Sequence, residues 1–160
     1  MLFEETIDGY LYSTDKDKLQ FDVIHNFLAN DSYWAKGISR DILKRSINNS
    51  ECFGIYSGSQ QVGFARVVTD KATFGYIGDV FVLQPHRGRG ISKNLMTFIL
   101  KHPELQGFRR WMLLTADAQE LYSKFGFIKF HAPERCMELW FPDVYGSDPD
   151  KKIIAAKENN

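Results

Sequence analysis

Hydrophobic and polar positions along the chain change their period several times, and each period predicts an element. Alternation with a period of two predicts β-strands over 7–13, 52–56, 62–68 and 74–83. The second and third of these strands are separated by Ser57-Gly58-Ser59, a turn sequence that predicts a hairpin. The first half of the chain therefore contains the strands of an antiparallel sheet.

Two helices are predicted between the first strand and the hairpin. Asp15 and Asp17 offer carboxylate caps to a helix whose apolar face carries Ile24, Phe27 and Leu28. Ser39 is an N-cap candidate for a second, short helix over 40–47. The two helices are separated by a loop over 31–37.

The second half of the chain predicts a crossover. Its helix carries apolar residues at the i, i+4, i+7, i+8 spacing of one buried face: Ile91, Leu95, Phe98 and Ile99. The continuous apolar run 111–115 is typical of a buried strand, so the strand 74–83, this helix and the run predict a right-handed unit with parallel strands. Asp117 is predicted to cap a last helix that ends at Gly126, and strands over 127–130 and 135–141 are predicted to complete the sheet.

Composition indicates the class of protein but does not identify a partner. With 160 residues, 44% of them hydrophobic, the chain has the length and apolar content of one domain, predicted over 1–145 and followed by a polar tail over 146–160. Twenty basic and twenty acidic side chains give a net charge of zero, which argues against nucleic-acid and membrane partners. Two cysteines without metal-ligand spacing and an N-terminus unlike a signal peptide predict a cytoplasmic protein with free thiols.

The segment from Val80 to Ser92 carries the clearest chemical signal. A strand passes through a turn with glycines at 88 and 90 into the amphipathic helix. Glycine allows positive φ and close approach of a ligand to the backbone, and the free N–H groups of a helix N-terminus attract anions. Lys93 and the lack of a Gly-Lys-Ser/Thr ending exclude the dinucleotide and P-loop fingerprints. The segment therefore predicts a phosphate cradle, the alternative being an ordinary strand-to-helix turn.

The spacing Arg87-x-x-Gly90-x-Ser92 resembles the coenzyme A pyrophosphate loop of the GCN5-related N-acetyltransferases, the GNAT family. Ser92 stands where that family usually has Gly or Ala. The order of predicted elements, and a last helix that runs from Tyr122 into Phe127, resemble the same family over nearly the full chain. The resemblance implies an α/β fold with a mixed, mostly antiparallel central sheet, a splayed parallel strand pair and flanking helices.

By the same resemblance, acetyl-CoA is the cosubstrate. Its pantetheine arm is expected to lie along the backbone of Phe81, Val82 and Leu83, where a main-chain N–H can also stabilise the oxyanion. Its pyrophosphate is expected at the backbone amides of the loop and at three cationic side chains. These residues are Gly88, Arg89, Gly90, Ile91 and Ser92 for the amides, and Arg87, Arg89 and Lys93 for the cations.

The resemblance also implies catalytic and acceptor residues. Tyr122 matches the tyrosine that protonates the departing thiolate, although its place on an apolar helix face is also that of a core residue. Asp79 is a candidate base for the amine, with a water chain as the alternative. Tyr33, Trp34 and Arg66 are candidates for the acceptor pocket. The four histidines have no paired spacing, so no metal site is predicted; His86, inside the loop, is expected to contact phosphate or only solvent.

Together these patterns predict an N-acetyltransferase that moves an acetyl group from acetyl-CoA to a primary amine by direct attack in a ternary complex. The acceptor is a small-molecule amine or a protein amine. The alternatives are a noncatalytic acyl-CoA sensor or scaffold with the same fold, and a protein that binds another anion such as a nucleotide. The predicted strand over 135–141 has an exposed edge that could pair across a homodimer.

Overall fold

The computed structural model describes residues 1–146, and its centre is one six-stranded sheet of order β1-β2-β3-β4-β5-β6. Neighbouring strands are antiparallel from β1 to β5, and β5 and β6 are parallel. The strands are β1 (Glu4–Ile7), β2 (Tyr10–Ser13), β3 (Glu51–Ser57), β4 (Gln60–Thr69), β5 (Phe74–Val82) and β6 (Arg110–Leu113). The α-helices are α1 (Phe21–Asn26), α2 (Arg40–Asn48), α3 (Ile91–Leu100) and α4 (Gln119–Ser123). The predicted mixed, mostly antiparallel α/β fold is confirmed.

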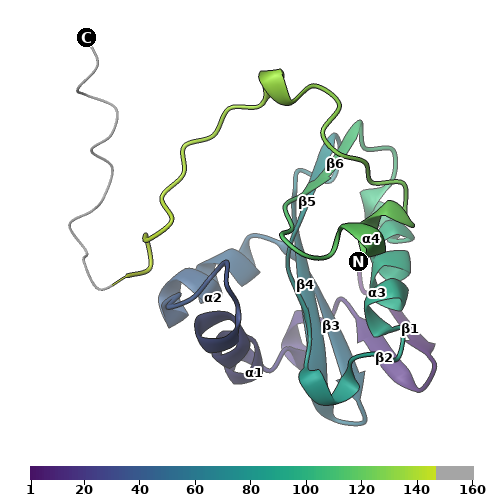
Figure 1. The fold of residues 1–160 in the computed structure, drawn as a ribbon. Coiled ribbons are helices and arrows are strands. Elements are labelled where there is room, and N and C mark those ends of the chain that lie inside the picture. Colours follow the sequence, from purple (N-terminus) through teal and green to yellow (C-terminus); the bar gives the residue numbers. More distant parts are fainter. Residues whose placement is uncertain (147–160) are drawn as a thin grey trace.

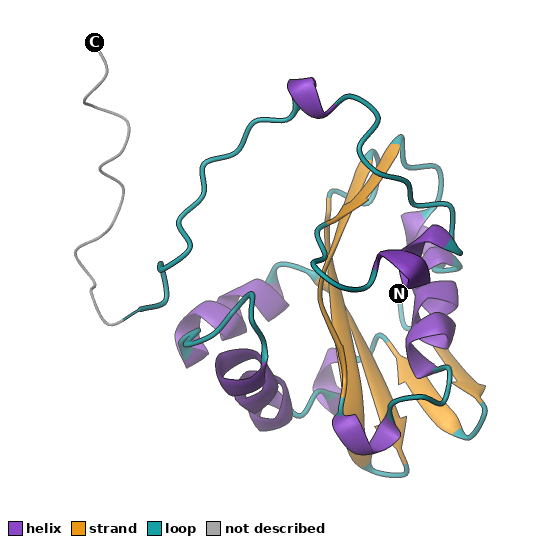
Figure 2. Cartoon of the chain, in the orientation of Figure 1, coloured by secondary structure: helices purple, strands orange, loops and turns teal. Residues whose placement is uncertain are grey.

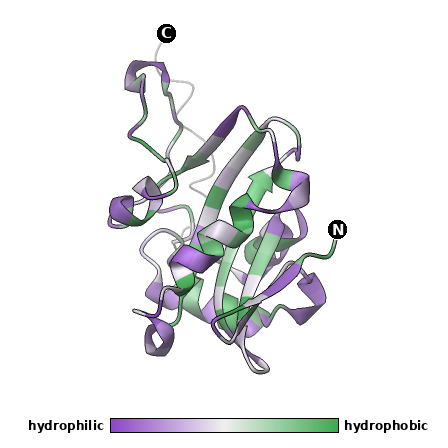
Figure 3. Ribbon diagram, turned by 90° about the vertical axis from the view of Figure 1, so that its right-hand side faces the viewer, coloured by the Kyte–Doolittle hydropathy of each residue, from purple (hydrophilic) through white to green (hydrophobic). Residues whose placement is uncertain are grey.

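The helices cover both faces of the sheet. Figure 1 shows α1 and α2 on one face and α3 and α4 on the other. Each face has its own hydrophobic cluster: Ile24, Leu43 and Phe64 belong to the α1–α2 side, whereas Ile77 and Leu95 belong to the α3–α4 side. The hydrophobic residues concentrate on the strands and on the helix packed over them (Figure 3). Burial of these two apolar layers is the main stabilising contribution to the fold.

A β-bulge in β5 changes which face its side chains occupy. Phe64 pairs with Phe81 but Arg66 pairs with Gly78, so β5 has one residue more than β4 across this stretch. Asp79 lies there with φ of 53°, a left-handed conformation that aspartate tolerates better than most residues. The extra residue places Ile77 on the α3–α4 side and Phe81 on the α1–α2 side. Odd-numbered side chains of β5 therefore face one side of the sheet before the bulge and the other side after it.

The predicted first strand over 7–13 was wrong, because two strands occupy this part of the chain. β1 and β2 form a hairpin with Asp8 and Gly9 at its turn, both at positive φ (52° and 80°). Asp-Gly is a preferred pair for such two-residue turns, so the signal was present in the sequence.

The predicted helix caps were partly right. Ser39 caps α2 by accepting a hydrogen bond from the Ile42 N–H, and Gly126 has the left-handed φ of 86° expected at a helix end. Asp15, however, caps a short 3-10 turn (Lys16–Lys18), so α1 begins only at Phe21. The prediction for Asp117 was wrong: the Thr115 hydroxyl oxygen accepts hydrogen bonds from the Asp117 and Ala118 N–H groups instead.

The strands predicted over 127–130 and 135–141 are absent, and within residues 1–146 the sheet ends at β6. Phe127 packs against Tyr122, and a 3-10 turn (Pro133–Arg135) then redirects the chain. Figure 2 shows the segment that follows as a loop that leaves the sheet and returns toward α2. Alternation predicts an extended segment but not whether a partner strand lies beside it. Of the polar tail predicted over 146–160, residues 147–160 lie outside the described part.

Candidate active site

The turn between β5 and α3 leaves backbone N–H groups without hydrogen-bond acceptors. A 3-10 turn (Gln84–His86) leads to Gly88 and Gly90, which have φ of 75° and 77°. Gly90 is the N-cap of α3 and provides no side-chain hydrogen bond to the first N–H groups of the helix. No heavy atom lies within 4 Å of where a Cβ would stand at either glycine. This loop therefore presents free N–H groups and the positive end of a helix dipole to open space.

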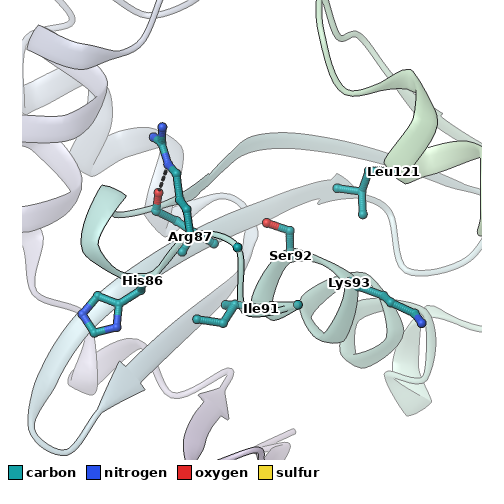
Figure 4. A pocket seen from close by; sticks show the side chains of 9 residues that line it. His86, Arg87, Ile91, Ser92, Lys93 and Leu121 are labelled. Carbon is teal, nitrogen blue, oxygen red and sulfur yellow. Dashed lines mark hydrogen bonds between the residues drawn. The ribbon is translucent and has the colours of Figure 1, made fainter.

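A cavity of about 190 Å³ opens over this loop. Figure 4 shows the Ser92 hydroxyl in the space between the Arg87 and Leu121 side chains, which also line the cavity. Its lining residues are Val82, His86, Arg87, Gly88, Gly90, Ile91, Ser92, Lys93 and Leu121. The structure thus brings together seven of the residues predicted to bind the cosubstrate, and the serine that departs from the family pattern contributes a polar group rather than an obstruction.

The cationic side chains of the loop point in different directions. The Arg87 Nε donates a hydrogen bond to the Val82 carbonyl oxygen at 2.9 Å, which ties the loop to the end of β5. Arg89 does not line the cavity; its Nη1 donates to the Tyr10 hydroxyl at 3.3 Å. That hydroxyl also lies 3.1 Å from His86 Nδ1 in a hydrogen bond. Lys93 lines the cavity with its stem, and its ammonium points away from the loop (Figure 4).

The carboxyl-terminal half of β5 has an unpaired edge. β6 pairs only with Phe74–Ile77, whereas β5 continues to Val82. Along this stretch the Phe81 side chain is core, stacked on Phe27 at 4.0 Å between ring centroids. The Leu83 N–H already donates to the Val62 carbonyl, and the Val82 carbonyl accepts from Arg87. On the β6 side, β5 therefore has no partner strand from Gly78 to Val82.

Tyr122 lies on the inner side of α4 and is 7% exposed. Burial raises the pKa of its phenol to about 12, with smaller contributions from Tyr33, Asp117 and Tyr76. The hydroxyl consequently keeps its proton at neutral pH. Leu121, the preceding residue, lines the cavity over the glycine loop, so α4 carries both a residue of the cavity wall and the tyrosine.

Asp79, Arg66 and Trp34 form one polar network on the α1–α2 side of the sheet. The Arg66 Nε donates to Asp79 Oδ2, and the Trp34 indole N–H donates to Asp79 Oδ1 at 2.9 Å. A second nitrogen of Arg66 donates to the Ser50 hydroxyl at 3.2 Å. Both oxygens of the Asp79 carboxylate are thus engaged by donors, in a site where that side chain is 8% exposed.

The loop after α1 bridges the two diverging strands. Trp34 reaches β5 through Asp79, while the Tyr33 hydroxyl accepts a hydrogen bond at 3.0 Å from the Ala116 N–H, just beyond β6. The two rings meet edge to face, 4.9 Å between centroids. Tyr33 and Trp34 therefore form an aromatic strap across the opening between β5 and β6, next to Tyr122.

Two residues of this region were not predicted as site residues: Leu121 and Tyr76. His86, which was expected in the loop beside phosphate or solvent, lines the cavity. Leu121 was identifiable from its position before Tyr122. Tyr76 carried no signal, because a tyrosine in an alternating strand is common. Asp79 and Tyr33 add to the rise in the pKa of Tyr76 that is caused mainly by burial.

Residues 1–146 contain neither a metal-binding group nor a membrane-spanning helix. No group of three or more histidine, cysteine, aspartate or glutamate side chains is placed to hold a metal ion. None of the helices combines the length and hydropathy needed to cross a membrane.

Comparisons with known proteins agree with this architecture. The family described as "Acetyltransferase (GNAT) domain" matches residues 48–129, from the end of α2 to just beyond α4. A protein of Gibberella zeae, provisionally named an acetyltransferase, is 36% identical over 141 residues, covering 74% of this chain and 78% of the relative.

Solved structures extend the similarity. A Xanthomonas campestris protein provisionally assigned to the GNAT family is 45% identical with a TM-score of 0.86, covering 89% of this chain and 100% of its own. A Clostridium acetobutylicum acetyltransferase, assigned from sequence and solved with acetyl-CoA, shares the fold at 16% identity and a TM-score of 0.59, over 87% of this chain and 96% of that one.

The fold and the glycine loop thus define an acyltransferase of the α/β class. The chain belongs to the GNAT family of acetyltransferases.

Proposed function

We propose that this protein transfers an acetyl group from acetyl-CoA to a primary amine by direct attack in a ternary complex. One observation carries the proposal: the uncapped N-terminus of α3 and two left-handed glycines form the floor of a cavity that is also lined by Leu121, the residue before Tyr122. A phosphate-bearing donor bound there would lie beside the helix that carries the proposed proton donor.

The cradle is suited to a pyrophosphate. Its N–H groups at Ile91, Ser92 and Lys93 have no intrahelical acceptor, since they belong to the first turn of α3. Anions at such a terminus gain on the order of 1 kcal/mol per favourable charge interaction. Ser92 adds a hydroxyl directed into the cavity (Figure 4), while Arg87, bonded to Val82, keeps the loop closed on the end of β5.

Tyr122 is proposed as the acid. In the transfer, the amine nitrogen bonds to the acetyl carbonyl carbon and the carbon–sulfur bond breaks. The departing thiolate takes the phenolic proton, and the amine loses one to a base or to water. A pKa of about 12 keeps the phenol protonated and ready to donate at neutral pH. The tyrosinate that results is then reprotonated from solvent.

The acceptor is proposed to enter beside Tyr33, Trp34 and Arg66. Trp34 and Arg66 donate hydrogen bonds to Asp79, which is the candidate to hold or deprotonate the amine. Asp79 accepts one hydrogen bond on each carboxylate oxygen, from Trp34 and Arg66. In the alternative role, Asp79 positions Trp34 and a water molecule takes the amine proton.

A noncatalytic acyl-CoA-binding protein is the second candidate. The engagement of both Asp79 oxygens favours it, because a pure sensor needs no free base near the thioester. Tyr122 favours the enzyme, because a sensor needs no buried proton donor beside the strand opening.

Calorimetric titration with acetyl-CoA is the first test, followed by screening of amines for release of free thiol. Binding with amine-dependent thiol release supports the enzyme. Binding without release for any amine supports the sensor, and no binding by a folded protein contradicts both.

A further inference from the structure

Three apolar residues on neighbouring strands form a row on the α1–α2 face of the sheet. We define the row as Val68, Tyr76 and Met112. Tyr76 pairs with Val68 of β4 on one side and with Met112 of β6 on the other, and cross-strand partners share a face. Val67 and Ile77 belong to the α3–α4 cluster, so alternation places Val68 and Tyr76 on the opposite face. The row therefore crosses the sheet just before β5 and β6 diverge.

Within residues 1–146, no helix covers the row. Figure 1 shows α1 and α2 beside the lower part of the sheet, whereas the upper ends of β5 and β6 carry no helix on this face. None of the three side chains belongs to the hydrophobic cluster described under α1 and α2. Val68 is 42% exposed, and Tyr76 and Met112 are half-buried. Adjacent apolar side chains that are left open to solvent mark a binding surface.

The row is continuous with the aromatic strap and with Asp79. Burial raises the pKa of Tyr76, with a further contribution from Asp79 and a smaller one from Tyr33, so both groups lie near this phenol. Gly78 stands between Tyr76 and Asp79, and a Cβ at this glycine would lie 3.2 Å from the Tyr76 ring. The ring thus reaches over Gly78 toward the bulge. Tyr76 therefore connects the row with the polar network that contains Asp79.

The charged groups that flank the row already have partners. The Asp79 carboxylate is paired with the Arg66 guanidinium. Arg110 lies two residues before Met112 on β6, hence on the same face, and its guanidinium packs on the Phe130 ring, 5.3 Å from the ring centroid. A second charged group on the acceptor would meet apolar side chains here, and burial of a charge without a partner is costly. The surroundings of the row therefore favour an uncharged, apolar group.

We propose that the acceptor is a primary amine carried on an aliphatic or aromatic group, which lies on the row while the nitrogen lies beside Asp79. This inference rests on the proposed acetyl transfer and names its substrate class. The neutral amine forms a bond to the acetyl carbon, the bond from that carbon to sulfur breaks, and the amine proton balances the thiol. The products are an N-substituted acetamide and coenzyme A.

Three amines of the same length that differ at their far end test this substrate class. Hexylamine ends in a methyl group, 1,6-diaminohexane in an ammonium group and 6-aminohexanoate in a carboxylate. We expect kcat/KM, measured as thiol release at saturating acetyl-CoA, to be roughly tenfold or more higher for hexylamine than for the other two. Each methylene removed from hexylamine should lower kcat/KM about fourfold, as expected for the burial of an apolar chain.

Val68→Asp places a carboxylate in the row. We expect this variant to lower kcat/KM for hexylamine roughly tenfold and to raise it for 1,6-diaminohexane, because the far ammonium group then gains a partner. Val68→Thr keeps the branched shape of the side chain and tests the same contact with less risk to folding, which thermal unfolding checks; it should also lower the hexylamine value. Leu2→Asp, the same change of charge at an exposed leucine beside the opposite edge of the sheet, should leave both values unchanged.

Calorimetric titration of the protein saturated with coenzyme A separates this inference from the proposed transfer. Binding of hexylamine without thiol release from acetyl-CoA supports the row as an amine site and contradicts the transfer. Transfer to 1,6-diaminohexane or 6-aminohexanoate in preference to hexylamine supports the transfer and overturns the assignment of the row. Equal rates for the three amines, no binding or transfer of any of them, or a wild-type preference in Val68→Asp overturns that assignment as well.

Discussion

Replacing Gly90 by aspartate tests the phosphate cradle most directly. Gly90 has φ of 77° at the N-cap of α3, so any side chain there is strained by about 1–2 kcal/mol even though the space is open. Aspartate adds a negative charge at the mouth of the cavity. At about 4 Å from a phosphate charge, the repulsion is about 1 kcal/mol at the dielectric constant of water and about 4 kcal/mol near a protein surface.

That range converts to roughly 5-fold to 1000-fold weaker binding of acetyl-CoA. Gly90→Ala is the matched control, because it introduces the same backbone strain without the charge. We expect both variants to unfold at a lower temperature than the wild type, and Gly90→Asp to bind acetyl-CoA much more weakly than Gly90→Ala. Calorimetric titration measures the affinities, and thermal unfolding measures the strain.

The acetyl-CoA affinities of the two variants show whether a phosphate binds at the α3 N-terminus. Wild-type affinity in both variants would refute the cradle. An equal loss in both would assign the effect to loop geometry rather than to charge, and would contradict a phosphate beside the α3 N-terminus.

Three further predictions concern the tyrosine, the aspartate network and a buried histidine. Tyr122→Phe should lower the rate of thiol release at saturating acetyl-CoA while leaving the dissociation constant for acetyl-CoA nearly unchanged. Unchanged turnover would mean that Tyr122 is a core residue and not the acid. Asp79→Asn keeps a carbonyl acceptor but removes the charge that pairs with Arg66. If Asp79 positions the strap, acceptor KM should rise more than kcat falls and the pH profile should keep its shape, whereas loss of the acidic limb would identify it as the base. His102 is fully buried, and burial lowers its pKa below the usual 6.5. Since the unfolded chain then binds a proton that the folded chain does not, the free energy of unfolding should fall as pH decreases below about 6.5. His102→Asn can still accept the Glu104 N–H, so chemical denaturation over this pH range should give a flatter profile for the variant; identical slopes would contradict the assignment.

Local patterns in the sequence were enough to predict the crossover unit and its loop. The face of α3, the glycines at 88 and 90 and the Ser39 cap are all encoded within a few residues of where they act, and the structure has each of them. The motif around Arg87 and Tyr122 also predicted the GNAT family, which the comparisons confirmed. Most of the cavity lining was predictable for the same reason, because the loop supplies it from consecutive residues.

What only the tertiary structure decided depends on register and on partners distant in the chain. The bulge at Asp79 reverses the alternation of β5, so Phe81 packs on the α1–α2 side and Asp79 meets Arg66 and Trp34. No local period encodes one extra residue in a strand. The strand predicted over 135–141 shows the same limit: its alternation predicts an extended segment with one apolar face, but no strand lies beside it within residues 1–146. Periodicity determines which side chains should be buried, whereas tertiary packing determines what buries them.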